Sequence, residues 1–591
     1  METPTVDDEE ILANIDGRMH GPMDRFIKKH FGSFQYVHQD GILKIEPAGR
    51  PSSLCATPLA TPSPDDFLRW FSNYLSDECD GARGAWHIQG SNASAGSQGP
   101  EDDARLLLLI PATPASQTVM RWDDVQVVGQ FYRNDGVSYR DGLVELSRSA
   151  YHVFASQPTR LFLHGFYIRR SLIEFWVFDR SGLYCSEVFD IQRDFDQFLS
   201  LVLSYQRMTD RQLGKGDIIE TDEGGNYITF GSSSMTSLGK LYLECPPIAS
   251  RGGLSGNGTT CYRARKVGSN QWSYAVKFKW RWVRKRPEEE LLKLANKKRV
   301  WGAVSLDYYK EIETTSDLRQ GLRWGTHRKF LDYAAKRRDN NLQQHKGHRD
   351  GFAQYTEDTD DYMQNRVLTC IVTSPAGRPL HTFQSLSELL RVFHDAIKCH
   401  RSLYHDAEIL HQDISAGNII ILDDEDDGSP KGILIDLDAA IQLADREGAE
   451  PSIIGTRLFI AIGVMNGEEH TYRHDLESFL YVFLWTIITN HAESLPETSR
   501  LRHWDNGTWT ELATRKSIDM TQSRFEEILK EFSPEYTALK PLARNLRQLV
   551  FSVRGGILWT GTDDSPGGIA ALYDSFMKAF EVAGVASHGK A

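Results

Sequence analysis

The sequence predicts an α+β protein in which a smaller α/β domain precedes a larger domain with a small β-rich lobe and a helical lobe. Two observations predict this arrangement. Between residues 106 and 205, short apolar strands alternate with helically spaced apolar residues, which is the pattern of an α/β unit. From about residue 238, the pattern changes to short strands around a glycine-rich turn, then a charged helix, further strands and long helices.

The 591 residues are too many for one compact core, so the chain is expected to form several domains. The predicted segments are a helical arm with a Pro/Ser/Thr-rich linker over 1–62, the α/β domain over 63–208, a polar linker over 209–237 and the larger domain over 238–585. Within the larger domain, residues 317–363 are too polar and charged to form core, so we expect a charged insertion there.

The α/β domain is expected to begin with a helix that ends near Leu75, because Ser63-Pro64-Asp65-Asp66 is a favourable helix start before an apolar run. Residues 80–103 are rich in Gly, Ser, Asn and Asp and predict a loop. The elements expected after this loop are strands over VQVVGQFYR, LFLHGFYIRR and LIEFWVFDR, and helices over Gly142–Ser156 and Phe195–Tyr205.

Composition narrows the classes of function. The formal net charge of −13 argues against a general affinity for nucleic acids or anionic membranes, which requires a basic surface. The seven cysteines are scattered without metal-binding spacing and predict reduced thiols. The N-terminus lacks the apolar core of a signal peptide, and the apolar run from Phe479 to Ile488 is too short to span a membrane and predicts a buried helix. We therefore expect a soluble, intracellular protein, cytoplasmic or nuclear.

The strongest chemical signal is HQDISAGNIII, in which His411, Asp413 and Asn418 follow the H-x-D-x-x-x-x-N spacing of a phosphotransferase catalytic loop. Phosphoryl transfer requires a carboxylate that orients the attacking hydroxyl, here Asp413, and a nearby amide oxygen that holds magnesium, here Asn418. The apolar strand that follows, Ile419 to Leu422, would anchor the loop.

A second carboxylate, Asp436, ends the next apolar strand in GILIDLDAA, where a kinase has the magnesium-binding Asp of its D-F-G motif. Mg²⁺ prefers oxygen ligands, so a carboxylate and an amide that converge from neighbouring strands predict a metal site. Asp438, two residues on, adds a further carboxylate that either binds magnesium or stiffens the loop.

Upstream, Lys277 lies in YAVKF, which matches the V-A-I-K strand whose lysine contacts nucleotide phosphates, with Lys279 as the competing position. Glu288 begins a helical EEELL pattern eleven residues later and is expected to form an ion pair with Lys277. Gly256 and Gly258 precede the strand and would let backbone amides approach phosphates, although the third glycine of G-x-G-x-x-G is missing.

Downstream, GTRLFIAIG stands where a kinase has G-T-x-x-Y-x-A-P-E, so the usual buried glutamate is replaced within Ala461-Ile462-Gly463. Asp475 begins a very apolar helix in RHDLESFLYVFLWTII, where a kinase has an Asp that binds the backbone of the catalytic loop. Asp475 and His411 are therefore expected to support the site structurally.

These motifs, together with the segment FWVFDRSGLYCSEVFDI, make residues 60 to 560 resemble the fungal-type protein kinase family. The resemblance implies a bilobal protein-kinase-like fold, ATP and Mg²⁺ as cofactors, and transfer of the ATP γ-phosphate to a serine or threonine hydroxyl of a protein substrate. The α/β domain is then expected to be a regulatory domain or to bind a partner protein. A nuclease is disfavoured because Gln130 and Tyr132 occupy the positions that would bind metal.

Several residues depart from the usual protein kinase pattern. Gln412 replaces the Arg of H-R-D, so an activation-loop phosphate would lack its usual cationic partner. Ser415 replaces the basic residue that contacts the transferred phosphate, and Leu437 and Asp438 replace the Phe and Gly of D-F-G. Small-molecule kinases of the aminoglycoside and choline type share these departures and are one alternative. A pseudokinase or scaffold is the other, because a fold does not by itself imply function.

Overall fold

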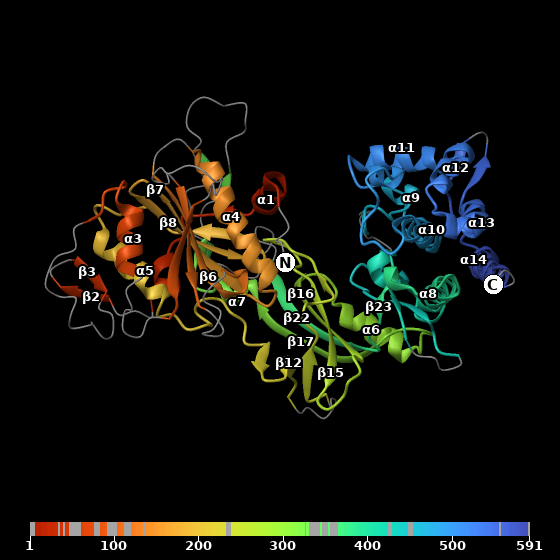
Figure 1. Ribbon diagram of the computed structural model, residues 1–591, viewed down its shortest axis with the longest axis horizontal. Coiled ribbons are helices and arrows are strands. Elements are labelled where there is room, and N and C mark those ends of the chain that lie inside the picture. The colour runs from red at the N-terminus through yellow and green to blue at the C-terminus, as the bar shows by residue number, and fades with distance from the viewer. Residues whose placement is uncertain are drawn as a thin grey trace. The chain divides into compact units, whose positions relative to one another are not determined.

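The computed structural model describes residues 6–32, 36–39, 42–45, 61–75, 83–90, 103–110, 120–133, 137–231, 238–324, 327–329, 343–344, 353–354, 365–423, 428–446, 453–554 and 557–588. Most of the predicted loop over 80–103 and of the predicted insertion over 317–363 lies outside them. The chain forms two compact units (Figure 1). The first contains residues 1–269, 276–285 and 310–370, and the second contains 270–275, 286–309 and 371–591. The domain boundaries predicted from the sequence stay a prediction.

The first unit contains a large mixed sheet, in which β6 pairs with β7 in parallel, whereas β5 pairs antiparallel with β6 and β8 pairs antiparallel with β7. Its strand order is β20-β19-β1-β9-β8-β7-β6-β5-β4, and β10 pairs with β8. The strands are β1 (Met19–His20), β4 (Ala85–Gly90), β5 (Asp103–Leu109), β6 (Val125–Tyr132), β7 (Phe162–Arg169), β8 (Leu172–Asp179), β9 (Gly182–Cys185), β10 (Phe189–Asp190), β19 (His327–Lys329) and β20 (Gln343–Gln344).

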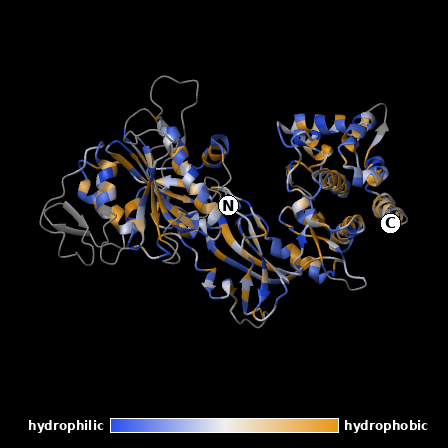
Figure 2. Cartoon of the chain, viewed as in Figure 1, coloured by the Kyte–Doolittle hydropathy of each residue, from blue (hydrophilic) through white to orange (hydrophobic). Residues whose placement is uncertain are grey.

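Helices cover both faces of this sheet, because its central strands are apolar on both sides. Leu106 and Leu108 of β5 belong to the core that includes residues of α3 and α5, whereas Leu107 faces the core formed with α1 and α4. Figure 2 shows how strongly hydrophobic residues dominate the strands. The helices are α1 (Asp8–Ile15), α2 (Phe26–Phe31), α3 (Phe67–Leu75), α4 (Tyr139–Ser156) and α5 (Phe195–Tyr205). The strands and helices predicted from the sequence between residues 125 and 205 are confirmed.

A second sheet has the strand order β11-β12-β13-β15-β16-β22-β17, with β14 paired to β15. Its strands are β11 (Glu220–Asp222), β12 (Gly225–Thr229), β13 (Lys240–Leu243), β14 (Ala249–Ser250), β15 (Thr260–Lys266), β16 (Tyr274–Trp282), β17 (Ser305–Thr314) and β22 (Arg366–Ser374). Two of these strands, β11 and β12, lie within residues 209–237, which the sequence predicted to be a linker. They are polar and largely exposed, and backbone pairing to β13 places them in the sheet.

The first residues of the charged stretch 317–363 contact the large sheet of the first unit. The turn after α7 (Thr315–Leu318) places Arg319 against Asp179 of β8, and both side chains are almost fully buried. Arg319 Nε donates to Asp179 Oδ2 at 2.6 Å. Arg328 of β19 is also buried and donates to Glu174 Oε1 of β8 at 3.1 Å. These arginines can be buried because each is paired with a carboxylate. Short strands β18 (Arg323–Trp324) and β21 (Ala353–Gln354) pair with each other.

The second unit is mainly helical and has one continuous hydrophobic core. Phe393 of α8 and Phe580 of α14 stack within it, with ring centroids 5.5 Å apart. Its helices are α6 (Glu288–Lys297), α8 (Leu386–Asp406), α9 (Ile462–Met465), α10 (Tyr472–Thr489), α11 (Trp509–Asp519), α12 (Gln522–Lys530), α13 (Lys540–Val550) and α14 (Pro566–His588). Its short strands are β23 (Arg378–Pro379), β24 (Ile409–Leu410), β25 (Ile419–Ile421), β26 (Gly432–Leu434), β27 (Ile441–Gln442), β28 (Ser552–Arg554) and β29 (Ile557–Trp559).

Helix α10 lies at the centre of this core. All of its residues except Trp485 are buried, which confirms the buried helix predicted around Phe479 to Ile488. Thr471 caps its N-terminus, where it forms a capping box with His474. Within the part of the chain that the structure describes, no helix combines the length and the apolar character needed to cross a membrane.

Candidate active site

The loop from His411 to Asn418 connects β24 to β25 in the second unit, and two of its own side chains, His411 and Asn418, bond to its backbone. The Asp413 N–H donates to His411 Nδ1 at 3.3 Å, so Nε2 of the ring carries the proton that is donated to Ile435 O at 3.2 Å. His411 is fully buried, and burial lowers the pKa of its imidazole. A neutral His411 therefore connects the loop to the strand that leads to Asp436.

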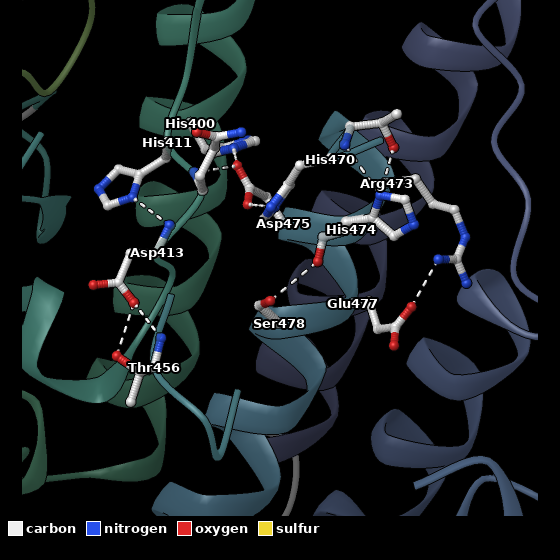
Figure 3. A network of polar contacts seen from close by, with 12 residues as sticks. His400, His411, Asp413, Thr456, His470, Arg473, His474, Asp475, Glu477 and Ser478 are labelled. Atoms are coloured by element: carbon white, nitrogen blue, oxygen red, sulfur yellow. Dashed lines mark hydrogen bonds and ion pairs between the residues drawn. The ribbon is translucent and has the colours of Figure 1, made fainter. Parts of the chain in front are cut away.

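Both carboxylate oxygens of Asp413 accept hydrogen bonds, and Figure 3 shows the two bonds from Thr456 to Oδ1. Oδ1 accepts from the N–H and the hydroxyl of Thr456, at 2.8 and 2.7 Å. Oδ2 accepts from Asn418 Nδ2 at 3.2 Å, and the same Nδ2 donates to Asp413 O at 2.8 Å. Among the described residues, no donor reaches the amide oxygen of Asn418. That oxygen is available to a cation, while the amide nitrogen orients Asp413.

The Asp475 carboxylate accepts a hydrogen bond from the backbone of the loop, and Figure 3 shows it beside the loop. Its Oδ2 accepts from the Gln412 N–H at 3.2 Å and from His400 Nε2 at 2.8 Å, and its Oδ1 accepts from His470 Nε2 at 2.8 Å. Burial of Asp475 opposes ionisation, but His470 and His400 hold the pKa of the carboxyl well below its usual range. The anchor matters because Gln412 has a φ of 64°, a conformation that costs energy for a residue with a side chain.

Three carboxylates gather beside this loop within the second unit. Glu288 of α6, Asp436 and Asp438 each offer an oxygen, and the three oxygens all lie within 4.8 Å of one another. Glu288 is buried and accepts from the Leu437 N–H at 3.0 Å, while Asp436 Oδ1 accepts from the Asp438 N–H at 3.2 Å. Carboxylates this close repel one another when all are ionised, and oxygen ligands of this kind fit Mg²⁺. The structure thus brings Asp436 and Asp438 together and adds Glu288 to them.

Lys277 lies on β16. The structure assigns Lys277 to the first unit and Glu288 to the second unit. The alternative lysine, Lys279, is buried within the same strand, where its carbonyl accepts from Thr369 at 3.1 Å. The side chain of Lys277 is only partly buried, as the phosphate-contacting residue predicted from the sequence would be.

The turn with Gly256 and Gly258 belongs to the first unit and adopts positive φ values of 96° and 48°. The Gly256 N–H donates to Arg180 O at 2.9 Å, so this amide is engaged within the protein. A Cβ at Gly258 would come within 2.6 Å of Arg180 Cζ, so the absence of a side chain lets the turn approach Arg180. Asn257 O accepts from the Trp280 N–H of β16 at 2.8 Å, which attaches the turn to the second sheet.

The segment after Thr456 is held by a buried lysine that the sequence analysis missed. Lys516 of α11 donates to the carbonyl oxygens of Arg457, Leu458 and Ile460, at 3.2, 2.9 and 2.8 Å. Burial lowers the pKa of Lys516 to about 7. Three carbonyl acceptors match the three N–H donors of the ammonium form. Gly455 allows the segment to approach the catalytic-type loop closely, because a Cβ at this position would lie 2.9 Å from Gln412 O.

A second residue that the sequence analysis missed is Glu477 of α10, a buried glutamate that contacts the backbone of the Ala461-Ile462-Gly463 segment. Its Oε1 accepts from the Ile462 N–H at 2.7 Å and from the Tyr481 hydroxyl at 2.7 Å. Its Oε2 pairs with Arg473 Nη1 at 2.7 Å, as Figure 3 shows. Glu477 lies two residues after Asp475 in the sequence, so the D-L-E-S motif contained the signal for both anchors.

A family model described as Fungal protein kinase matches residues 108–487, which is more than half of the chain. The matched range includes strands β6 to β10 of the large sheet as well as the loops around Asp413 and Asp436. A search of curated proteins found no match.

Replacing Asp475 by asparagine is expected to destabilise the protein by roughly 1–3 kcal/mol at pH 7, because the amide leaves a buried donor without an acceptor. The folded-state pKa of Asp475 lies below its unfolded value. Its ionised form therefore stabilises the fold above about pH 4, and this contribution is lost as the pH falls further. The difference between wild type and Asp475→Asn in urea unfolding should consequently shrink below pH 4.

The matched control is Asp574→Asn, because Asp574 is 63% exposed and pairs with Arg401 at the surface. Its effect should stay below about 1 kcal/mol. Equal losses in the two variants, or a difference for Asp475 that grows in acid, would contradict the assignment.

Proposed function

We propose, from the premise that the chain belongs to the fungal protein kinase family, that it transfers the γ-phosphate of Mg-ATP to a serine or threonine hydroxyl of a protein substrate. Family membership supports a protein kinase. Specificity for serine or threonine, and the use of ATP and Mg²⁺, belong to the proposal.

The observation that carries the proposal is the fixed carboxylate of Asp413. Thr456 and Asn418 hold its two oxygens from opposite sides, so the group cannot rotate away from an incoming hydroxyl without losing hydrogen bonds. A carboxylate in this setting orients a hydroxyl nucleophile and accepts its proton during transfer. Positioning of this kind supplies much of the rate enhancement in phosphoryl transfer.

The residues that would hold Mg²⁺ are Asn418, Asp436 and Asp438. Their donor set fits the ion, because it combines an amide oxygen without a described donor with two carboxylates of a three-carboxylate cluster. Bound Mg²⁺ supplies neutralisation of the negative charge on the ATP phosphates. Lys277, braced by Glu288, would align the phosphates, and the turn with Gly256 and Gly258 would cover them.

The proposed fold is a bilobal protein-kinase-like domain. The sheet β13-β15-β16-β22-β17 would be the small lobe, with α6 beside it, and the helices from α8 to α14 would form the large lobe. The large sheet before residue 208 would then be a regulatory or partner-binding domain. The expected partners of the protein are its protein substrates.

Asp413→Asn should lower magnesium-dependent phosphate transfer from labelled ATP at least a hundredfold, because the amide cannot accept the proton of the hydroxyl. Stabilisation of the protein by Mg-ATP in a thermal-shift assay should remain. Asp423→Asn is the matched control, since Asp423 is 70% exposed and pairs with Arg378 near the same loop.

The acceptors in this assay should include general protein substrates and a panel of small alcohols. Transfer only to a small alcohol would replace the protein kinase by a small-molecule kinase. The absence of both transfer and stabilisation by Mg-ATP would favour a pseudokinase.

Asp438→Gly restores the usual glycine after D-L and removes one carboxylate from the cluster. If Asp438 binds the metal, the Mg²⁺ concentration needed for nucleotide binding should rise several-fold, because a lost charged ligand weakens the site. Nucleotide affinity is to be titrated at varied Mg²⁺ in parallel with Asp445→Gly, whose exposed carboxylate pairs with Arg286. An unchanged magnesium dependence would exclude Asp438 as a ligand.

A further inference from the structure

A pocket of about 230 Å³ opens in the first unit where β7 and β8 meet α4 and β19. Its floor contains Glu174, a buried carboxylate whose oxygens are both engaged. Tyr139 donates to Oε2, and Arg328 Nη1 donates to Oε1 at 3.1 Å and lies 2.8 Å from Cys185 Sγ. Because Arg328 neutralises Glu174, the floor presents no net negative charge.

The remaining polar groups of the pocket are donors without acceptors. Tyr167 is 2% exposed, and among the described residues its hydroxyl has no hydrogen-bond partner. The guanidinium of Arg169 lies 5.9 Å from the centre of the Tyr139 ring, and no carboxylate in the described part of the chain pairs with it. Buried Nε of Arg328 is likewise unpartnered there. Unpaired buried donors are costly, so these groups indicate that an acceptor completes the site.

The rim of the pocket is apolar and exposed. Leu172 is 41% exposed and Val188 is 50% exposed, so both offer apolar surface at the mouth of the pocket. Leu172 stands directly opposite Arg169 in the β7–β8 pairing, so a charged and an apolar contact lie side by side. A ligand that satisfies both contacts joins an anionic group to an apolar one.

We propose that this pocket binds a small organic anion, in which a carboxylate or phosphate-monoester group faces Arg169 and Tyr167 and an apolar group contacts Leu172 and Val188. The volume suits a ligand smaller than a typical drug-sized molecule. Arginine provides planar, charge-assisted recognition for both kinds of anion.

Isothermal titration of the full chain with benzoate and with phenyl phosphate tests this proposal. At least one of them should bind, inorganic phosphate should bind more weakly, and neutral benzyl alcohol should not bind. The comparison of benzoate with phenyl phosphate identifies which anionic group is preferred. Arg169→Gln should weaken binding at least tenfold, and Tyr167→Phe should weaken it several-fold.

Arg170→Gln is the matched control, because Arg170 is the next residue, is exposed and does not line the pocket. The same control separates this pocket from phosphate binding elsewhere in the protein. The proposal is overturned if neither anion binds, or if binding is equally strong in Arg169→Gln and in Arg170→Gln with their thermal midpoints unchanged.

A second inference concerns the glycine turn and rests on the proposed function. Within the first unit, two residues from outside the turn, Asn14 and Arg180, form hydrogen bonds with residues 253–255, which lead into it. Asn14 of α1 accepts from the N–H groups of Leu254 and Ser255 at 3.2 and 3.3 Å, and its carbonyl accepts from the Ser255 hydroxyl at 3.0 Å. Arg180 Nη1 donates to Gly253 O at 2.6 Å.

The residues that make these contacts are packed in the hydrophobic core or against it. Leu254 is 3% exposed and packs in the same hydrophobic core as Ile11 of α1. Asn14 Nδ2 donates to Glu10 O at 2.8 Å, which turns Oδ1 of Asn14 toward the turn. Arg180 is 1% exposed and lies 4.5 Å from the centre of the Phe154 ring, so its position is fixed.

We infer that Asn14 and Arg180 are positioning residues that set the place of the Gly256–Gly258 turn for nucleotide binding. Asn14→Ala should increase backbone hydrogen exchange over residues 252–258 about tenfold, because two amides lose their acceptor. It should also change the KM for Mg-ATP several-fold, with a smaller effect on kcat. Glu9→Ala, at an exposed position of α1, is the control.

Backbone hydrogen exchange over residues 252–258 tests the contacts of Asn14 with the turn, and this measurement does not require an active enzyme. Unchanged exchange in Asn14→Ala would overturn the inference, as would faster exchange with an unchanged KM in an active enzyme. If wild-type protein transfers no phosphate, the proposed function fails, and nucleotide affinity measured by titration replaces KM as the readout.

Discussion

The buried carboxylate of Asp475 is the interaction on which the candidate active site depends. It joins three segments, namely α8 through His400, the residues just before α10 through His470, and the loop through the Gln412 amide. Tyr573 of α14 extends this chain to His400 Nδ1 at 2.8 Å. Because the carboxylate cannot donate, His400 must carry its proton on Nε2, which leaves Nδ1 to accept from Tyr573. One charge therefore orders the hydrogen bonds of four elements.

The position of the Asp413 carboxylate depends on a second layer of contacts around that anchor. Thr456 fixes the carboxylate, Lys516 fixes the carbonyls after Thr456, and Glu477 fixes the amide of Ile462. The segment is thus held at its start, middle and end by charged groups that point at its backbone. These contacts are made to backbone atoms of the segment, so they do not depend on the identity of its side chains at those positions.

Local patterns in the sequence carried much of this structure. The alternation of apolar residues predicted β7 and β8, and the spacing from His411 to Asn418 and on to Asp436 predicted the residues that gather around the loop. Lys516 could not be predicted, because a lysine on an amphipathic helix normally faces water and only tertiary packing buries it. Arg180 and Asn14 were missed for the same reason, since their partners lie far along the chain. The roles predicted for the site residues themselves stay predictions until activity is measured.

The pairing of Arg319 with Asp179 and of Arg328 with Glu174 has a consequence for how the chain is made. Both carboxylates lie on β8, in a sheet whose other major strands are complete by residue 185, yet their partners are synthesised more than a hundred residues later. Until then the growing chain contains two acidic groups in an apolar sheet with no counter-charge, a costly arrangement. On the ribosome the first unit therefore cannot finish folding as an N-terminal domain usually does. It has to wait for the turn after α7 and for β19 to emerge, so the nascent sheet is exposed to chaperones for longer than its place in the sequence suggests.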